Sequence, residues 1–313
     1  MSSLPVWLQE VRNRVKAFLK GQNTRLSLSK LVSPALPDVV CVDVGASYYP
    51  HIAWDFFLRS KNTSWLAIEP NKANLGYVDN WSWACRITTC TTGLSRDGGE
   101  QILYLTNVDS GSSLLPPNVL PSMKHRVKNV DYFFPFQEKP IETLTLAQAL
   151  ALQPKTGPIL VKLDTQGTEL SILQGAQNLF DEKRIVGIEL ESTMLADPIM
   201  QGSAKFWQAC EYLEAQGFEL MHVKPIHDVR QSGRRRPTAR TYLNECDAIF
   251  SVKRDVASGL AVEVRATLLA FYLTNLFYEE ALSWLTEDRE LRDYLFTRNC
   301  PVDEVTRRLQ ASI

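Results

Sequence analysis

The sequence predicts an α/β protein built on a mostly parallel sheet of seven strands, the last of which runs antiparallel. From residue 38 to residue 254, short aliphatic runs typical of buried strands alternate with helical segments. Such alternation favours a parallel sheet with helices on both faces. The last two strands have no helix between them, so they should be antiparallel neighbours at one edge of the sheet.

The bulk composition restricts the class of protein. The 313 residues include 34 basic and 35 acidic side chains and carry a net charge of −1, which gives no global attraction to nucleic acid or anionic lipid. The six cysteines are scattered without a C-x-x-C pair, so we expect reduced thiols in a cytoplasmic protein and no zinc site. No apolar run reaches membrane-spanning length, and charges interrupt the N-terminal segment where a signal peptide needs an apolar core.

The predicted elements divide the chain into three parts. Residues 1–37 form an N-terminal helical segment, in which an amphipathic helix at 5–20 is expected to pack on the main domain rather than lie on a membrane. The main domain covers residues 38–254, and residues 255–313 read as a helical extension. Helices within the main domain are expected at 168–180 and at 203–216, the second closed by Gly217.

The strands follow in chain order. The seven main strands are expected at 39–47, 64–71, 86–95, 157–164, 184–191, 218–224 and 246–254. Residues 101–107 also read as a strand, which follows the third main strand. Open parallel sheets bind ligands beyond the carboxyl ends of their strands, so residues at those ends are the candidates for chemistry.

The first two strand ends carry acidic residues. Asp43 and Gly45 end the first strand, and Glu69 ends the second, 26 positions after Asp43. A dinucleotide site needs G-x-G-x-x-G, but the turn DVGASYYP has one glycine, and its Asp would repel a phosphate. S-adenosylmethionine has no phosphate and carries a cationic sulfonium, which an acid in this loop favours. Glu69 can accept two hydrogen bonds from ribose hydroxyls. The competing interpretation is that these acids merely cap helices.

Six segments in order resemble the FkbM-type methyltransferase family, a branch of the class I S-adenosylmethionine-dependent enzymes with a Rossmann-like sheet. They are VDVGAS (42–47), AIEPN (67–71), SGSSL (110–114), ETLTL (142–146), VKLDTQGTELSILQGA (161–176) and IELE (188–191). The 161–176 segment is the most specific of them. The chain departs from the family pattern at Gln166, where the family often has Glu, and in the glycine-poor first turn at 48–51.

The resemblance, together with the strand-end positions, implies a set of cofactor-binding residues. These are Asp43, Gly45, Ala46, Ser47, Glu69, Pro70, Asn71, Ser95, Asp164 and Gln166. The adenine ring is expected near the end of the third strand, against Thr92, Leu94 or Ser95, with Asp97 as a partner for its amino group.

Catalysis is expected around the segment VKLDTQGTEL. Methyl transfer to a hydroxyl requires alignment of the nucleophile and removal of a proton. Asp164 could accept that proton, orient the acceptor or hold the cofactor's amino group, and Lys162 lies on the same face and could pair with it. Glu169 is expected either to take part in this chemistry or to stabilise the start of its helix. The candidate catalytic residues are Asp164, Lys162, His51 and Glu191, and His222 and His227 are further candidates for the base.

Two further features concern metals and partners. Asp164, Glu189 and Glu191 could together bind Mg²⁺, although substrate orientation or simple solvation is favoured and no metal is expected. The run RQSGRRRPTAR at 230–240 either forms a solvated loop or meets an anionic acceptor through Arg234, Arg235, Arg236 and Arg240. Nucleic acid is not an expected partner, because a broad basic face with interleaved aromatics is missing.

The function predicted from the sequence is S-adenosylmethionine-dependent O-methylation of a glycan, a sugar-containing molecule or a secondary metabolite. The alternative is a catalytically silent Rossmann-like scaffold that keeps the fold. An oxidoreductase with a nicotinamide cofactor is disfavoured because the G-x-G-x-x-G motif is absent. The terminal helices could cover the active site or build a homodimer, and the sequence does not choose between these roles.

Overall fold

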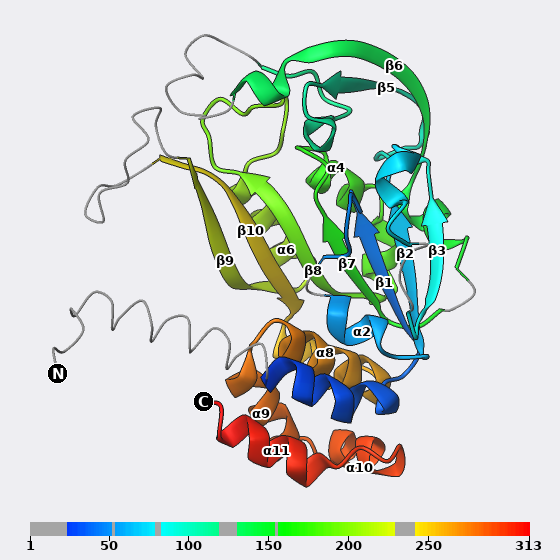
Figure 1. Ribbon diagram of the computed structural model, residues 1–313. Coiled ribbons are helices and arrows are strands. Elements are labelled where there is room, and N and C mark those ends of the chain that lie inside the picture. Colours follow the sequence, from blue (N-terminus) through cyan, green and yellow to red (C-terminus); the bar gives the residue numbers. More distant parts are fainter. Residues whose placement is uncertain (1–23, 52–53, 79–82, 119–129, 154–155, 229–241) are drawn as a thin grey trace, which may run out of the picture.

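The computed structural model describes residues 24–51, 54–78, 83–118, 130–153, 156–228 and 242–313. Its centre is a seven-stranded sheet in the order β3-β2-β1-β7-β8-β10-β9 (Figure 1). The strands are β1 (Val39–Val44), β2 (Thr63–Ile68), β3 (Arg86–Cys90), β7 (Ile159–Leu163), β8 (Ile185–Thr193), β9 (Phe218–Asp228) and β10 (Tyr242–Val252). β10 runs antiparallel to both β8 and β9, whereas the other pairs are parallel. The predicted sheet and its reversed last strand are confirmed.

The central strands are buried on both faces. Every residue of β1, β2 and β7 is buried. β1 and β7 are therefore mainly apolar runs rather than an alternation of apolar and polar residues, as expected for parallel strands covered on both sides, whereas β2 begins with the buried polar residues Thr63 and Ser64. The exceptions in β1 and β7 are Asp43 and Lys162, which lie next to each other in the sheet register.

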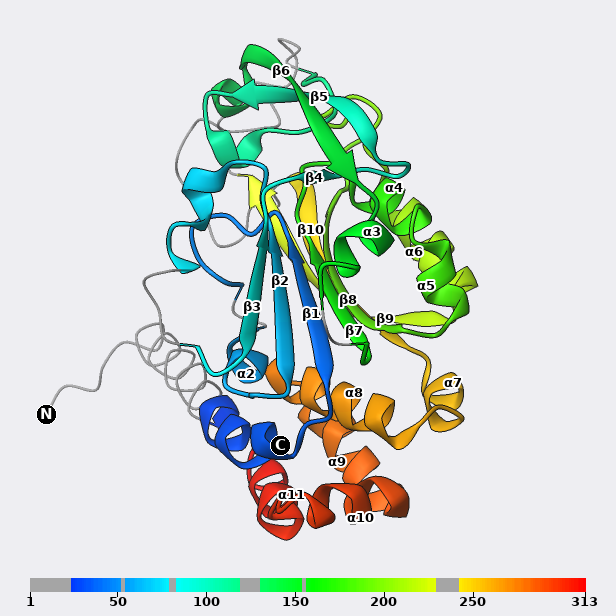
Figure 2. The same cartoon turned by 90° about the vertical axis from the view of Figure 1, so that its right-hand side faces the viewer.

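A second, three-stranded sheet lies over the carboxyl ends of the main strands (Figures 1 and 2). It consists of β4 (Gly93–Leu94), β6 (Pro135–Leu144) and β5 (Gly99–Thr106), in that spatial order. The predicted strand at 101–107 therefore belongs to this sheet. The predicted strand at 86–95 is divided, because its last part pairs with β6 rather than continuing β3. β6 was not predicted, because its two prolines and charged residues give no apolar alternation.

Short helices accompany the main sheet. They are α2 (Asp55–Leu58), α3 (Leu146–Leu150), α4 (Glu169–Gln174), α5 (Gln177–Asp181) and α6 (Phe206–Ala215), with 3₁₀ turns η1 (Ser33–Ala35), η3 (Lys72–Leu75), η5 (Asp109–Gly111) and η7 (Val130–Phe133). The helix predicted at 168–180 is broken in two. At the break, a Cβ on Gly175 would lie 2.1 Å from the carbonyl oxygen of Arg96, so the backbones touch there. α6 confirms the helix predicted at 203–216, and Gly217 ends it with a φ of +87°.

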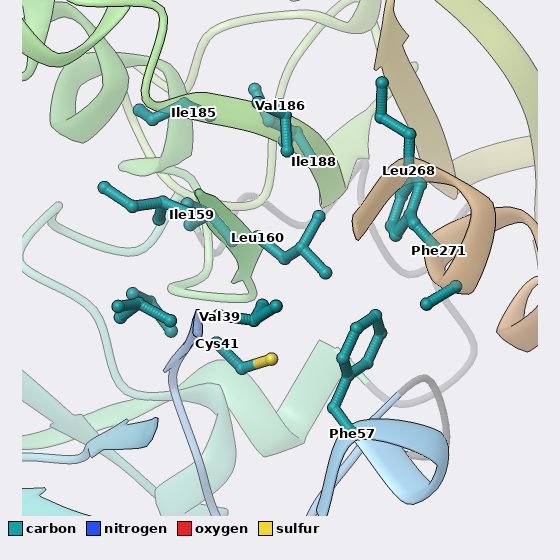
Figure 3. Packing of buried hydrophobic residues seen from close by; sticks show 14 of the residues in the cluster. Val39, Cys41, Phe57, Ile159, Leu160, Ile185, Val186, Ile188, Leu268 and Phe271 are labelled. Carbon is teal, nitrogen blue, oxygen red and sulfur yellow. The ribbon is translucent and has the colours of Figure 1, made fainter. Parts of the chain in front are cut away.

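The C-terminal residues are helical, as predicted. They form α7 (Arg254–Ser258), α8 (Val262–Thr274), α9 (Tyr278–Glu287), α10 (Arg289–Thr297) and α11 (Val302–Gln310). α8 packs its side chains Leu268 and Phe271 toward Leu160 and the neighbouring strands (Figure 3). Gly187 in β8 makes this contact close, since a Cβ there would lie 2.7 Å from Leu160 Cδ2 and 3.0 Å from Phe271 Cε1. The helical extension thus shares one hydrophobic core with the sheet.

The terminal helices lie near the amino ends of the parallel strands, opposite the small sheet (Figures 1 and 2). The helix predicted at 5–20 lies outside the described residues. Residues 24–32 are helical, and Ser27 accepts a hydrogen bond from Arg308 of α11. The described terminal helices therefore do not cover the ligand-binding end of the sheet. Within the described ranges, no helix has the length and apolar content required to cross a membrane.

Candidate active site

A cavity of about 360 Å³ opens between the carboxyl ends of the main strands and the small sheet. It lies where open parallel sheets bind ligands. Its walls come from the loop after β1, the end of β2, the end of β7 and the following loop, β4 and β5, and the segment 109–114. Of the predicted site residues, those lining it are Asp43, Gly45, Ser47, His51, Glu69, Pro70, Asn71, Leu94, Lys162, Asp164 and Gln166.

Gly45 brings the loop after β1 against the end of β7. Its φ is +80°, and a Cβ on it would lie 2.0 Å from the carbonyl oxygen of Asp164. The amide of Asp164 donates to the carbonyl of Val44 at 3.0 Å, which closes the same junction. No side chain fits in this gap, so the glycine of the DVGAS turn is a requirement of the site's backbone.

Glu69 is placed as the sequence predicts for an acid that binds ribose. Its Oε2 accepts from the Ser47 hydroxyl at 2.6 Å, and its Oε1 accepts from the Asn71 amide at 2.8 Å. Burial raises the pKa of this carboxyl, and the two hydrogen bonds act against that rise. Each carboxylate oxygen has two lone pairs, so acceptor capacity is left for hydroxyls of a ligand in the cavity.

Lys162 is clamped between two acidic residues. Its Nζ lies 3.6 Å from Asp43 Oδ1 and 3.2 Å from Asp164 Oδ2. Burial would lower the pKa of Lys162, but the two carboxylates outweigh it and raise that pKa. Asp43 is 1% exposed, and its Oδ2 accepts from the Trp54 indole at 2.9 Å. The predicted pairing of Lys162 with Asp164 is confirmed, whereas nothing in the sequence pattern singled out Trp54.

Asp164 presents a partly exposed carboxylate with several donors around it. Gln166 Nε2 donates to its Oδ1 at 3.0 Å, and Glu191 forms a further side-chain hydrogen bond with it. Burial favours the neutral form of Asp164, but Lys162 and these hydrogen bonds prevail and lower its pKa. Burial and the adjacent Asp164 raise the pKa of Glu191. Glu191 lines a small separate cavity behind Asp164 rather than the main one.

His51 and Glu189 form a second polar pair at the cavity wall. His51 Nε2 lies 3.4 Å from Glu189 Oε1. Burial, together with the charge of Lys162, lowers the pKa of His51. Burial and the nearby Asp247 raise the pKa of Glu189 to about 7.

The loop after β7 is folded around Glu169. The Oε1 of Glu169 accepts from the amides of Thr165 at 2.7 Å and Gly167 at 3.0 Å. Gln166 and Gly167 both have positive φ, and a Cβ on Gly167 would lie 2.1 Å from Ser203 Oγ. Glu169 is buried in the first turn of α4 and holds this loop in place. Of its two predicted roles, chemistry and stabilisation of the helix start, the contacts agree with the stabilising one.

Several cavity residues were not predicted. Tyr48 has a positive φ of 67°, and its hydroxyl donates a hydrogen bond to Asp109. This hydrogen bond is the main cause, and burial the second, of a rise in the pKa of Tyr48 to about 12. The contact ties Asp109, the residue directly before the SGSSL segment, to the loop after β1. Leu103 and Leu105 of β5 form an apolar part of the wall. The sequence QILYLTN shows the alternate spacing of these two leucines. It does not show that they lie at the cavity, because their position follows from the pairing of β5 with β6 in the small sheet.

Other predicted residues lie elsewhere. Ala46 is buried behind the cavity, and Ser95 bonds to Thr143 Oγ1 at 2.7 Å instead of lining it. Thr92 and Asp97 are also outside the lining, and His222 is exposed on β9. The side chain of His227 and the run with Arg234, Arg235, Arg236 and Arg240 lie outside the described residues. In the described part of the chain, no group of three or more His, Cys, Asp or Glu side chains is arranged to hold a metal ion.

Comparison with known proteins identifies the family. The Methyltransferase FkbM domain model matches residues 43–220. Among solved structures, the chain is similar to a precorrin-6y C5,15-methyltransferase of Geobacter metallireducens, with 15% identity, 74% of this chain and 88% of that chain covered, and a TM-score of 0.33. It is also similar to a Streptococcus pneumoniae protein provisionally assigned as a tRNA (m1A22) methyltransferase and solved with S-adenosyl-L-methionine, with 11% identity, coverages of 90% and 98%, and a TM-score of 0.32. A comparison with curated proteins gave no match.

The strand order and the acids at the ends of β1, β2 and β7 define a Rossmann-like, S-adenosylmethionine-dependent methyltransferase of class I. With more than half of its length matched, the chain belongs to the FkbM methyltransferase family.

The residues of the cavity fit S-adenosylmethionine. Asp43 and Asp164 outnumber the single ammonium of Lys162 at one end, which suits a cationic sulfonium and ammonium group. Glu69 lines the same cavity, and so do the apolar side chains Leu94 of β4 and Leu103 and Leu105 of β5. We therefore propose that Glu69 binds the ribose and that these apolar side chains contact the adenine.

Replacing Glu69 by glutamine tests this assignment. The change keeps the side-chain shape but removes the charge that strengthens hydrogen bonds to two ribose hydroxyls. Charge-assisted bonds contribute about 1.5–3 kcal/mol each, so we expect S-adenosylmethionine to bind about 100-fold more weakly. Calorimetric titration measures the change, with the exposed Glu100→Gln on β5 as the matched control. Equal affinity in wild type and Glu69→Gln would contradict the assignment.

Proposed function

We propose that this methyltransferase transfers its methyl group to a hydroxyl of a sugar-containing molecule or a related polyhydroxylated metabolite. The observation that carries the proposal is the set of proton-accepting groups around Lys162, at the end of the cavity formed by β1 and β7. Asp164 and His51 both line the cavity and lie near Lys162. A hydroxyl must lose a proton as it is methylated, so such groups are needed for O-methylation.

The chain's residues would act on the acceptor by positioning and by proton transfer. S-adenosylmethionine supplies an activated methyl group on a sulfonium. Asp164, fixed by Lys162 and Gln166, can accept a hydrogen bond from the acceptor hydroxyl and direct its oxygen along the line of displacement. The buried charges of this end exclude an apolar acceptor, because such a molecule would leave them without partners.

A sugar-type acceptor is supported by the groups around the cavity. Tyr48 and Tyr49 line it and are 49% and 69% exposed, so their rings are available for stacking against a sugar face. Asp164 lines the cavity, and its carboxylate can accept a hydrogen bond from a neutral hydroxyl and would repel an anion. We therefore favour a neutral acceptor and keep the anionic one suggested by the arginine run as the second choice.

An acceptor panel tests the proposed function. The purified protein is incubated with deuterated-methyl S-adenosylmethionine and with neutral oligosaccharides, nucleotide sugars, sugar phosphates and polyketide glycosides. We expect the label on a hydroxyl oxygen, located by mass spectrometry and NMR, with neutral acceptors preferred. Label on nitrogen or carbon, or no transfer to any hydroxyl by a protein that binds the cofactor, would overturn the proposal.

A further inference from the structure

The segment 109–114, which we call the roof segment, contributes residues to the cavity wall on the side of the small sheet. Its backbone is fixed there, because the amide of Tyr104 in β5 donates to the carbonyl of Ser113 at 2.8 Å and the amide of Ser113 donates back to Tyr104 at 3.3 Å. Just before the segment, the amide of Val108 donates to the carbonyl of Tyr132 at 3.2 Å. The small sheet, to which the segment is bound, lies over the carboxyl ends of the main strands (Figures 1 and 2).

A side chain from the loop after β1 reaches the roof segment. Tyr48 lines the cavity, and its hydroxyl donates a hydrogen bond to the carboxylate of Asp109. The residue is 49% exposed, so its ring lies where the cavity meets the solvent. The ring of Tyr48 therefore extends from the loop after β1 to the roof segment at the mouth of the cavity.

The backbone of Tyr48 has a conformation that a bulky residue rarely adopts. Its φ of 67° lies in the left-handed region. The amide of Tyr48 donates to the carbonyl of Asn74 at 2.9 Å, and its hydroxyl is bound to Asp109, so the residue is held at both ends. Residues in such conformations persist where the surrounding contacts fix them, and they are frequent in ligand clamps.

The acceptor of the Tyr48 hydrogen bond is fixed as well. Asp109 Oδ1 also accepts from the amide of Ser110 at 2.9 Å, and Asp109 Oδ2 accepts from Asn71 Nδ2 at 3.4 Å. The amide of Asn71 in turn donates to Glu69 Oε1 at 2.8 Å. These hydrogen bonds connect the mouth of the cavity with the carboxylate to which we assign the ribose.

We propose that Tyr48 is a gate residue for the cofactor. Its hydrogen bond to Asp109 holds the ring across the mouth of the cavity, with or without the cofactor inside, and must break for S-adenosylmethionine to enter and for S-adenosylhomocysteine to leave. A carboxylate acceptor makes this bond stronger than one between neutral groups. Water competes for both exposed groups, so the bond can open and close on the timescale of side-chain and loop motions. Opening of such a cover, rather than chemistry, limits turnover in many enzymes.

A gate of this kind predicts a particular pattern of binding rates. A bond that is the same in the free and the cofactor-bound protein slows entry and exit by the same factor. It therefore changes both rate constants but not their ratio, which is the dissociation constant. A side chain that contacts the cofactor acts mainly on the dissociation rate, so its loss weakens binding. Measuring both rate constants distinguishes the two cases.

Tyr48→Phe tests the proposal, because it keeps the ring and removes the hydroxyl. Surface plasmon resonance with S-adenosylhomocysteine over the immobilised protein measures both rate constants. We expect each to rise by about 5–20-fold from the loss of one exposed hydrogen bond to a charged group, and the dissociation constant to change by less than about threefold. The matched control is Tyr132→Phe, since Tyr132 is also 49% exposed and does not line the cavity. Its rate constants should equal those of the wild type.

A second variant tests whether the hydrogen bond itself is the gate. Asp109→Asn weakens the same bond from the other partner, so Tyr48→Phe and Asp109→Asn together should speed exchange no more than the stronger single variant does. Effects that multiply, unchanged rate constants in Tyr48→Phe, or a rise in the dissociation rate alone would overturn the proposed gate. These measurements need no acceptor, so the proposed transfer to a hydroxyl is tested separately by the acceptor panel.

Discussion

Gly45→Ala should abolish cofactor binding and destabilise the fold by about 3 kcal/mol or more. The new Cβ would lie 2.0 Å from the Asp164 carbonyl oxygen, and both residues directly follow neighbouring strands, β1 and β7, which fix their backbones. The residue would also be held at a φ of +80°, which L side chains avoid. To relieve the clash, β1 and β7 must separate where the cavity walls meet. Chemical denaturation and calorimetric titration of S-adenosylmethionine measure the two effects.

Gly99→Ala is the matched control for Gly45→Ala. Gly99 has a φ of +81°, but a Cβ on it would have no atom within 4 Å. Gly99→Ala should therefore lose only the free energy needed to hold an L residue at positive φ, about 1–2 kcal/mol. If both variants lose the same stability and both bind the cofactor, the close approach of the two backbones is not what the site requires.

Lys162→Met should cost about 3–5 kcal/mol of stability at pH 7, because two carboxylates then lose their shared counter-charge. Asp43 is fully buried, and Asp164 is buried in part. In the wild type, Lys162 lowers the pKa of Asp164, which stabilises the fold above the unfolded-state pKa and loses effect as pH falls. In the variant the carboxyl binds a proton more readily in the folded state than in the unfolded state, because Lys162 no longer stabilises its charged form. The deficit should therefore shrink between pH 7 and about pH 4.

The control for Lys162→Met is Lys224→Met, which removes a second Lys–Asp pair from the same sheet. Lys224 Nζ lies 2.7 Å from Asp247 Oδ2, but the lysine side chain is 70% exposed. Exposed pairs contribute about 0–1 kcal/mol, so this loss should be small and should depend on salt. Equal losses in urea denaturation would show that burial of Lys162 between Asp43 and Asp164 is not what matters.

The main sheet could be predicted from the sequence because its central strands are buried on both faces and β1 and β7 are therefore apolar runs with one charged residue each. It also predicted Glu69 and Asp164 at the cavity, since parallel strands place their carboxyl ends at one edge. The small sheet was harder to predict. β6 is almost wholly exposed, so no core imposes an apolar pattern on it.

The partners of the site residues could not be read from the sequence. Trp54 meets Asp43, and His51 meets Glu189, through a loop path that no periodicity describes. Ser95, in contrast, was predicted to bind the cofactor and does not line the cavity. It follows a strand, as a ligand-binding residue should, but β4 directs it toward Thr143.

A crystal structure with bound S-adenosylhomocysteine tests the central assignment most directly. The account predicts ribose hydroxyls on Glu69, adenine against Leu94 and the wall formed by β5, and the sulfur directed toward the end with Asp164 and His51. A ligand whose ribose lies away from Glu69, or whose sulfur faces the apolar wall, would contradict it.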